Sequence, residues 1–200
     1  MNVACVIGNG PSRKPLNLEY INSIMTTYGC NALYRDFLPD HLIAVDINMV
    51  YEIIDSKIHY NIPFYTQHST KTDALYKNGE PIEFIPNQPS TYDSGNAAID
   101  LAAINKHDII YMVGFDYVVN DTIPNIYTGT KNYTTNHFIP GANQQDVRWK
   151  KTLKHIIKKY PNTRFVRVMG NENNNINIKL DNFIEITTNE FTEELYGIYN

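Results

Sequence analysis

The chain has 200 residues, of which 42% are hydrophobic and 19% are charged, and its formal net charge is -4. This composition is typical of one globular domain spanning residues 1–200 and excludes a disordered or low-complexity chain. Two cysteines, Cys5 and Cys30, are too few for a disulfide framework or a cysteine zinc site, so we expect reduced, buried thiols. The start of the chain lacks a secretory signal, and no run reaches the roughly 20 apolar residues of a membrane helix. We therefore expect a cytoplasmic protein without membrane insertion.

The first dozen residues predict a strand, a tight loop and a helix. Val3 to Ile7 is apolar throughout, as in a strand covered on both faces, and Gly8-Asn9-Gly10-Pro11-Ser12 leads into an amphipathic stretch from Leu16 to Met25. The glycines allow close approach of a ligand, and amides at a helix start attract anions, so the loop is a candidate nucleotide-phosphate site. A simple turn is the alternative, because the full dinucleotide fingerprint and the Gly-Lys-Ser/Thr ending are both missing.

Further along, strand patterns alternate with helix patterns. We expect strands at 30–33, 41–46, 62–66, 108–113, 164–168 and 183–186, and helices at 48–56, 97–105, 144–160 and 190–196. Residues 67–89 are expected to be a polar surface region with local pairing at 82–85, and Ser94 is the expected cap of the helix after it. The alternation predicts an α/β fold with a doubly wound, mainly parallel sheet and helices on both faces.

Polar residues follow the predicted strands or precede a helix. Because ligands of such sheets bind at the carboxyl ends of the strands, we expect these residues to converge on one crevice. They are Asn9, Asn31, Asp46, Asn48, Ser94 and Asp116.

Residues from about 117 to 142 show no periodic pattern and are rich in Tyr, Thr, Asn and Gly. A loop of roughly 25 residues inside a domain is usually functional or disordered. Its contents favour a functional loop, and the residues that suggest this are Tyr117, Tyr127, Tyr133, Asn136 and His137.

A basic segment follows this loop. Eight basic residues and no acid lie between Arg148 and Arg167, within a helix pattern whose apolar positions are Val147, Leu153, Ile156 and Ile157. Such a segment attracts phosphates or nucleic acid, although a solvated helix face is the alternative. The possible acceptor or nucleic-acid contacts are Arg148, Lys150, Lys151 and Lys154.

Five short motifs resemble, in order and spacing, the bacterial sialyltransferases of glycosyltransferase family 42. The motifs are Gly8-Asn9-Gly10-Pro11-Ser12, Cys30-Asn31, Ala44-Val45 with Asn48, Ser94-Gly95, and Gly114-Phe115-Asp116. The similarity covers roughly residues 3–160. It implies a Rossmann-like fold of the GT-A-like kind and a single inverting displacement from a CMP-sugar, without a metal or a cofactor.

The resemblance also implies roles for single residues. Asn9 and Ser12, with the amides of Gly8 and Gly10, would hold the donor phosphate and ribose. Asn31 and Asn48 would contact the cytidine phosphate or the sugar, and Ser94 and Gly95 would bind near the nucleotide or a sugar carboxylate. The donor-binding set, completed by a strand-end carboxylate, is Gly8, Asn9, Gly10, Ser12, Asn31, Asp46, Asn48, Ser94 and Gly95.

The catalytic positions match the family less closely. Two tyrosines that steady the leaving phosphate there correspond here to Tyr117, one position off, and to Tyr127 or Tyr133 across a loop of different length. His137 is the candidate base, although Gly141 falls at the base position by register, and Asp116 is the second candidate base.

The sequence also departs from the family ahead of the Ser-Gly pair. The arginine usual in the family is replaced by Thr91-Tyr92-Asp93, which leaves donors other than sialic acid open.

The leading hypothesis is therefore a metal-independent, inverting glycosyltransferase that uses a pyrimidine nucleotide sugar. Its acceptor is a hydroxyl on a glycan or on modified phage DNA. The six histidines lack ligand spacing, so we expect no metal site. Two alternatives are an ATP- and magnesium-dependent enzyme resembling the archaeal 6-hydroxymethylpterin diphosphokinase-like family, and a non-catalytic nucleotide-binding module. The oligomeric state is left open.

Overall fold

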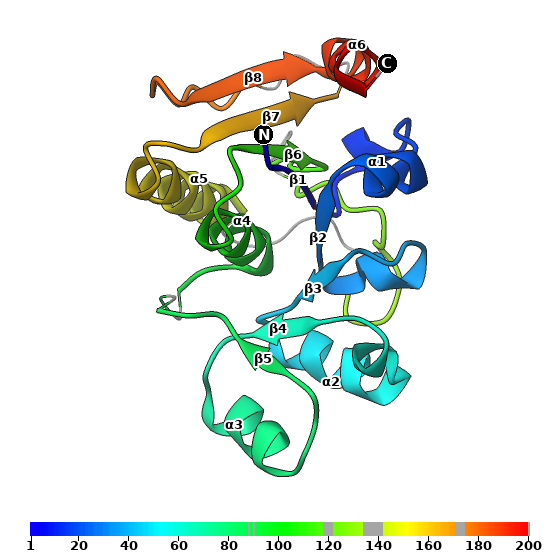
Figure 1. The fold of residues 1–200 in the computed structure, drawn as a ribbon. Coiled ribbons are helices and arrows are strands. Elements are labelled where there is room, and N and C mark those ends of the chain that lie inside the picture. The colour runs from blue at the N-terminus through cyan, green and yellow to red at the C-terminus, as the bar shows by residue number, and fades with distance from the viewer. Residues whose placement is uncertain (88, 90, 118–121, 134–141, 171–174, 200) are drawn as a thin grey trace.

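A computed structural model of the chain describes all residues except 88, 90, 118–121, 134–141, 171–174 and 200. Eight parallel strands form one sheet in the order β5-β4-β3-β2-β1-β6-β7-β8 (Figure 1). The strands are β1 (Val3–Ile7), β2 (Thr26–Cys30), β3 (His41–Ile43), β4 (Phe64–Thr66), β5 (Glu83–Phe84), β6 (Ile109–Val113), β7 (Arg164–Met169) and β8 (Phe183–Thr187). The winding reverses between β1 and β6, which confirms the predicted doubly wound sheet.

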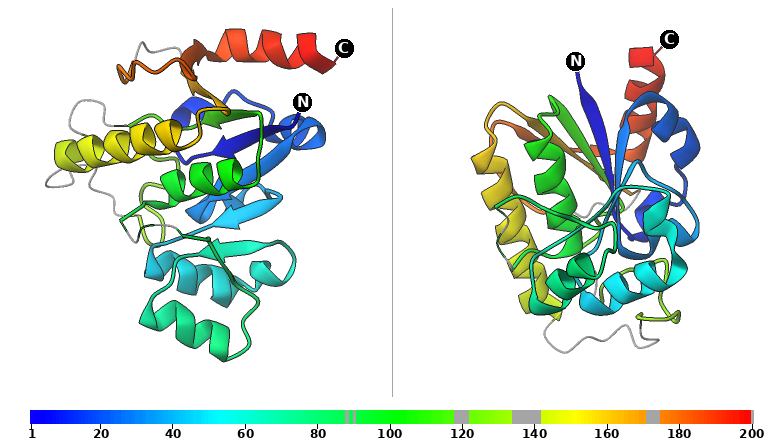
Figure 2. Two further views of the ribbon diagram at one scale, coloured as in Figure 1. Left: turned by 60° about the vertical axis from the view of Figure 1, so that its left-hand side comes forward. Right: turned by 60° about the horizontal axis from the view of Figure 1, so that its bottom comes forward.

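Helices cover both faces of the sheet (Figures 1 and 2). They are α1 (Leu18–Ile24), α2 (Ile47–Ser56), α3 (Thr70–Lys77), α4 (Ser94–Ile104), α5 (Ala142–Lys159) and α6 (Thr188–Tyr199), with short 3-10 turns η1 (Pro11–Arg13), η2 (Asn31–Arg35) and η3 (Ile58–Tyr60). α4 and α5 pack on one face, and α1, α2 and α6 pack on the other.

The alternation of side chains along β1 explains this sandwich. Ala4 and Val6 share a core cluster with α4 and α5, whereas Cys5 and Ile7 share one with α1 and α6. A strand that is apolar at every position is stable only when both of its faces are covered. The alanines of α4 are fully buried, and their small side chains let the helix lie close to the sheet.

The second strand begins earlier than the sequence pattern predicts. Thr26 to Cys30 pairs in register with β1, whereas residues 31–33 belong to η2, so the predicted strand at 30–33 is wrong. Asn31 has φ 54°, and this left-handed conformation ends the strand. The pattern was misleading because the Thr, Tyr and Gly residues of β2 do not form a continuous apolar run. Their burial depends on tertiary packing.

Residues 67–89 also contain more structure than the polar pattern indicates. Ser69 and Thr72 form a reciprocal capping box at the start of α3. This box uses Thr at its fourth position instead of Glu or Gln, which weakens the sequence signal. Glu83–Phe84 then forms β5, an edge strand parallel to β4, so the expected local pairing is replaced by pairing with residues 18 positions earlier.

The inward face of α5 differs from the predicted one at a single position. Val147 is 65% exposed, whereas Trp149 packs with Leu153, Ile156 and Ile157 against the sheet. Trp149 precedes Leu153 by four residues and therefore shares its face, but Val147 does not. Among the described helices, none combines the length and the apolar character needed to cross a membrane.

Candidate active site

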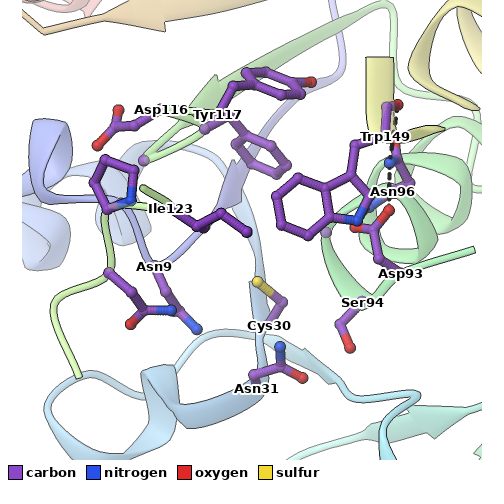
Figure 3. A pocket seen from close by; sticks show the side chains of 17 residues that line it. Asn9, Cys30, Asn31, Asp93, Ser94, Asn96, Asp116, Tyr117, Ile123 and Trp149 are labelled. Atoms are coloured by element: carbon purple, nitrogen blue, oxygen red, sulfur yellow. Dashed lines mark hydrogen bonds between the residues drawn. The ribbon is translucent and has the colours of Figure 1, made fainter. Parts of the chain in front are cut away.

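A pocket of about 150 Å³ opens at the carboxyl ends of the central strands, where the winding of the sheet reverses (Figure 3). The loops after β1 and β6 form one side, and the start of α4 forms the opposite side. This position is where open α/β sheets bind their ligands. The residues that line the pocket are Gly8, Asn9, Gly10, Cys30, Asn31, Asp93, Ser94, Gly95, Asn96, Gly114, Phe115, Asp116, Tyr117, Ile123, Pro124, Asn125 and Trp149.

The two glycines after β1 serve the protein's own packing. The amides of Gly8 and Gly10 donate to the carbonyls of Val113 and Gly114, at 2.8 and 2.9 Å. A Cβ atom at Gly8 would lie 2.5 Å from the carbonyl oxygen of Gly114. The glycines therefore let the loops after β1 and β6 touch, and their amides are engaged. The expectation that these amides hold a phosphate is corrected on this geometry.

Asp116 fastens the same pair of loops. Its carboxylate accepts a hydrogen bond from the Ser12 amide at 2.9 Å, at the first turn of η1. Ser12 does not line the pocket, and its Oγ is buried without a hydrogen-bond partner among the described residues. The anion that occupies this helix start is therefore Asp116, and this structural role is the one a strand-end carboxylate most often has.

Asn9 and Asn31 present unused acceptors to the pocket. Asn9 is 8% exposed and donates through Nδ2 to Tyr133 Oη at 3.3 Å. The Oδ1 atoms of Asn9 and Asn31 are buried and have no partner within the described part of the chain. Unpartnered buried oxygens cost free energy, so these two atoms indicate a ligand that donates hydrogen bonds.

The start of α4 forms the opposite wall. Asp93 caps the helix, accepting from the Asn96 amide at 3.0 Å and from Asn96 Nδ2 at 2.6 Å, so the expected cap at Ser94 is wrong. Burial raises the pKa of Asp93, and the hydrogen bonds from Asn96 oppose this effect. Asn96 also donates to the Trp149 carbonyl at 3.3 Å (Figure 3). Asn96 Oδ1 and Trp149 Nε1 are buried without partners among the described residues.

Ser94 and Gly95 line the pocket but are partly engaged by the scaffold. Ser94 Oγ accepts from the Val45 amide at 3.0 Å, which ties α4 to the chain just after β3. A Cβ atom at Gly95 would lie 2.9 Å from the Phe115 ring. The small residue therefore makes room for the aromatic side chain.

Tyr117 lines the pocket and has two cations near its ring. It has φ 57° and is 7% exposed, and burial raises the pKa of its hydroxyl, which therefore stays protonated at neutral pH. Lys150 Nζ lies 5.4 Å and the Arg167 guanidinium carbon 5.2 Å from the ring centre. Both cations also have acidic partners, since Lys150 binds Asp146 at 2.6 Å and Arg167 binds Glu185 at 2.5 Å.

The other two candidate tyrosines lie behind the pocket. Tyr127 donates to Asp36 and accepts from Arg13 Nη2 at 2.9 Å, within the core cluster around α2. Tyr133 reaches the site only through Asn9. Burial raises the pKa of both hydroxyls. Neither lines the pocket.

Two further predicted donor-binding residues lie outside the pocket, as Ser12 does. Asp46 is exposed and caps α2 by accepting from the Asn48 amide at 3.0 Å, and Asn48 is exposed as well. Their strand, β3, ends two positions away from β1 in the sheet. The expected convergence therefore holds for Asn9, Asn31, Ser94 and Asp116 and fails for these two.

The basic residues of α5 separate into two groups. Arg148, Lys151 and Lys154 are exposed on the helix, whereas Lys150 lies half-buried beside Tyr117. His137, the candidate base, falls outside the described residues. Within the described residues, no three His, Cys, Asp or Glu side chains gather as a group that could hold a metal ion.

Sequence reasoning missed several lining residues. Asp93 is recognisable as a helix cap, since it precedes Asn96 by three positions. Trp149 is recognisable as an inward-facing residue from its spacing of four positions to Leu153. Ile123, Pro124 and Asn125 carry no such signal, because their position depends on the backbone bond from the Ile126 amide to the Asn9 carbonyl at 2.8 Å.

Comparisons with known proteins point to one kind of fold. No model of a known protein family matches the sequence. No match was found among curated proteins.

Solved structures of the sialyltransferase Cst-II do resemble it. A variant in complex with CMP has a TM-score of 0.57 at 15% identity, with 98% of each chain covered. A complex with a trisaccharide acceptor and CMP has a TM-score of 0.53 at 14% identity, covering 99% of this chain and 98% of that one. CstII from Campylobacter jejuni with cytidine-5'-monophosphate has a TM-score of 0.53 at 13% identity, covering 100% and 99%. At these identities the likeness shows the fold.

Proposed function

We propose that the chain is a glycosyltransferase that binds a pyrimidine nucleotide sugar, with CMP as the first nucleotide to test. The observation that carries the proposal is the pocket at the β1–β6 reversal, in a fold shared over its whole length with sialyltransferase structures that contain CMP. The unpartnered Asn9 and Asn31 oxygens support a ligand rich in hydroxyl and amino groups, such as a nucleoside with a sugar.

The chemistry of this proposal is a single inverting displacement without a metal. The leaving phosphate takes its stabilisation from neutral donors, for which the protonated Tyr117 hydroxyl is available, and from Lys150 beside it. His137 takes the proton of the acceptor hydroxyl. Asp116 is less suited to that role because its carboxylate already binds the Ser12 amide.

A thermal-shift series tests the nucleotide. We expect CMP or another pyrimidine nucleotide to raise the melting temperature without magnesium, because a ligand of the native state stabilises it by mass action, by about 2.7 kcal/mol at one hundred times Kd. CDP, UDP, GDP, ADP and ATP, each with and without magnesium, complete the series. Stabilisation by ATP with magnesium alone would support the diphosphokinase alternative, and no shift with any nucleotide would contradict the proposal.

Asn31→Ala tests the pocket itself. Removing an amide that binds the ligand should cost about 1–2 kcal/mol, which raises the Kd of CMP about tenfold in isothermal titration. Asn61→Ala is the matched control, because Asn61 is exposed and follows η3 far from the lining residues. An unchanged Kd in Asn31→Ala would show that the pocket is misassigned.

His137→Ala tests the base. We expect transfer to be abolished while the Kd of the nucleotide stays within about twofold, because a general base acts on the acceptor and contributes 10²–10⁴-fold to the rate. Normal turnover by this variant would remove His137 from the mechanism. Retained binding without transfer in the wild type itself would favour the non-catalytic nucleotide-binding module.

The acceptor proposed first is a glycan hydroxyl. The exposed Arg148, Lys151 and Lys154 keep a nucleic-acid acceptor as a separate prediction. A triple change of these residues to Gln should leave transfer to a glycan unchanged and, if DNA is an acceptor, reduce the salt dependence of DNA binding.

A further inference from the structure

The pocket has an unusual distribution of charge. Its charged lining residues are two acids, Asp93 and Asp116, and none of its lining residues is Lys or Arg. All 17 Lys and Arg residues of the chain belong to the described part, so no further Lys or Arg exists to enter the pocket.

One backbone donor at each of two helix starts is already used by a carboxylate. The first turn of α4 donates its Asn96 amide to Asp93, and the first turn of η1 donates its Ser12 amide to Asp116. At these two helix starts a carboxylate of the chain therefore occupies the place where an anionic ligand group would otherwise bind, whereas η2, which starts at Asn31 in the pocket, has no side-chain cap. Figure 3 shows the two carboxylates on opposite sides of the pocket.

Near the pocket, Arg13 lies against Gly114 and is paired with Asp36, whereas Lys150 and Arg167 lie near the ring of Tyr117. Lys150 and Arg167 are each also paired with an acid. One anionic group, the phosphate of a nucleotide, can lie on the side of Tyr117. A second anionic group on the opposite side would lie towards Asp93, which lines the pocket together with Trp149 and whose own ionisation is opposed by desolvation. The same desolvation acts on a ligand carboxylate, and an ionised Asp93 repels it as well.

We propose that the donor sugar is uncharged and that Asp93 is the residue that rejects sugars bearing a carboxylate. The inference rests on the proposed function, because it describes the sugar of the same nucleotide sugar. A neutral sugar donates hydroxyl hydrogen bonds to Asp93 and to the Oδ1 atoms of Asn31 and Asn96, which have no hydrogen-bond partner among the described residues. A carboxylate group has only acceptors to offer at the same place.

Two pairs of probes test the proposal by isothermal titration. UDP-glucose and UDP-glucuronic acid differ only in one carboxylate, and CMP is compared with the stable donor analogue CMP-3-fluorosialic acid. We expect UDP-glucuronic acid to bind at least tenfold more weakly than UDP-glucose, and the CMP analogue to bind no more tightly than CMP. In Asp93→Asn, which keeps a good cap while removing the charge, the tenfold ratio should fall at least fivefold.

Asp55→Asn is the matched control, because it removes one charge from an exposed position of α2 and should leave the ratio unchanged. The proposal is overturned if the wild type binds CMP-3-fluorosialic acid tenfold more tightly than CMP, or if a folded Asp93→Asn variant keeps the wild-type ratio. Should Asp93→Asn not fold, the wild-type comparison decides the question. Failure of CMP and UDP to bind at all overturns the proposed function instead.

Discussion

The glycines of the first loop illustrate how a residue type can be predicted correctly and its use mistaken. Gly8 and Gly10 line the pocket as expected, but their missing side chains make room for the backbone after β6. The loops after β1 and β6 lie more than 100 residues apart in sequence and are joined by the hydrogen bonds from Gly8 and Gly10. Close packing of the two loops is therefore the first requirement for the pocket.

Gly8→Ala should destabilise the protein, because its Cβ would meet a backbone oxygen at 2.5 Å and one of the two loops would have to move. We expect a loss of about 1–3 kcal/mol, which lowers the melting temperature by roughly 2–10 °C for a chain of this size. Gly197→Ala is the control: it lies in α6 with no atom near the added Cβ, and should stabilise by about 0.5–1 kcal/mol. Equal melting temperatures for the two variants would refute this packing role.

At the scale of the elements, β7 supports the site without lining it. Arg167, 1% exposed in the core, donates through Nε to the Phe115 carbonyl at 2.8 Å and pairs with Glu185 of β8. Its guanidinium also lies over the ring of Tyr117. β7 and the edge strand β8 thereby hold the loop after β6 in place.

Arg167→Met should cost about 3–5 kcal/mol, because it leaves Glu185 buried and unpaired. Arg164→Met on the same strand is the matched control, since Arg164 is exposed, and should change stability by less than about 0.5 kcal/mol. Chemical denaturation measures both. A folded Arg167→Met variant that is as stable as the control would show that the ion pair contributes nothing. Under conditions that keep the Arg167→Met variant folded, it should bind CMP more weakly than the wild type does. The reason is that the position of Phe115 and Tyr117 depends on Arg167.

At the scale of the whole molecule, the two cysteines report on the core and the pocket separately. Both are free and buried, as the sequence predicts. Cys5 lies in the middle of the sheet, whereas Cys30 ends β2 and lines the pocket. Burial raises the pKa of both thiols, that of Cys30 to about 12, with a smaller contribution from Asp93.

Both thiols should therefore react slowly with a disulfide reagent at pH 8, where a thiol of pKa 12 is ionised in roughly one molecule in ten thousand. We expect unfolding in denaturant to accelerate labelling at least about a hundredfold, and CMP to protect Cys30 in the native protein without changing Cys5. Mass spectrometry of labelled peptides distinguishes the two positions. Rapid native labelling of Cys5 would contradict the buried position of β1.

Much of the fold could be predicted because its signals are local. The apolar runs of β1, β6 and β7 and the spacing along α2 and α4 are visible in short windows, and their alternation suffices for a parallel doubly wound sheet. The sequence predicts that the loops after β1 and β6 lie close together, because polar residues follow these two apolar strands, which must be central in the sheet. Asn9, Asn31, Ser94 and Asp116 entered the predicted site by this reasoning.

The remaining features depend on which strands become neighbours and on which partners lie nearby in space. β3 lies two places from β1, so Asp46 caps α2 and neither Asp46 nor Asn48 reaches the pocket. Asp93 and Asp116 bind amides at two helix starts, and this leaves the pocket with acids where an anion site was expected. Trp149 faces inward and Val147 outward because the packing of α5 on the sheet selects one helix face. The strand order, the bond between Ser12 and Asp116 and the packing of α5 on the sheet join residues that are distant in sequence, and periodicity within a short window contains no information about them.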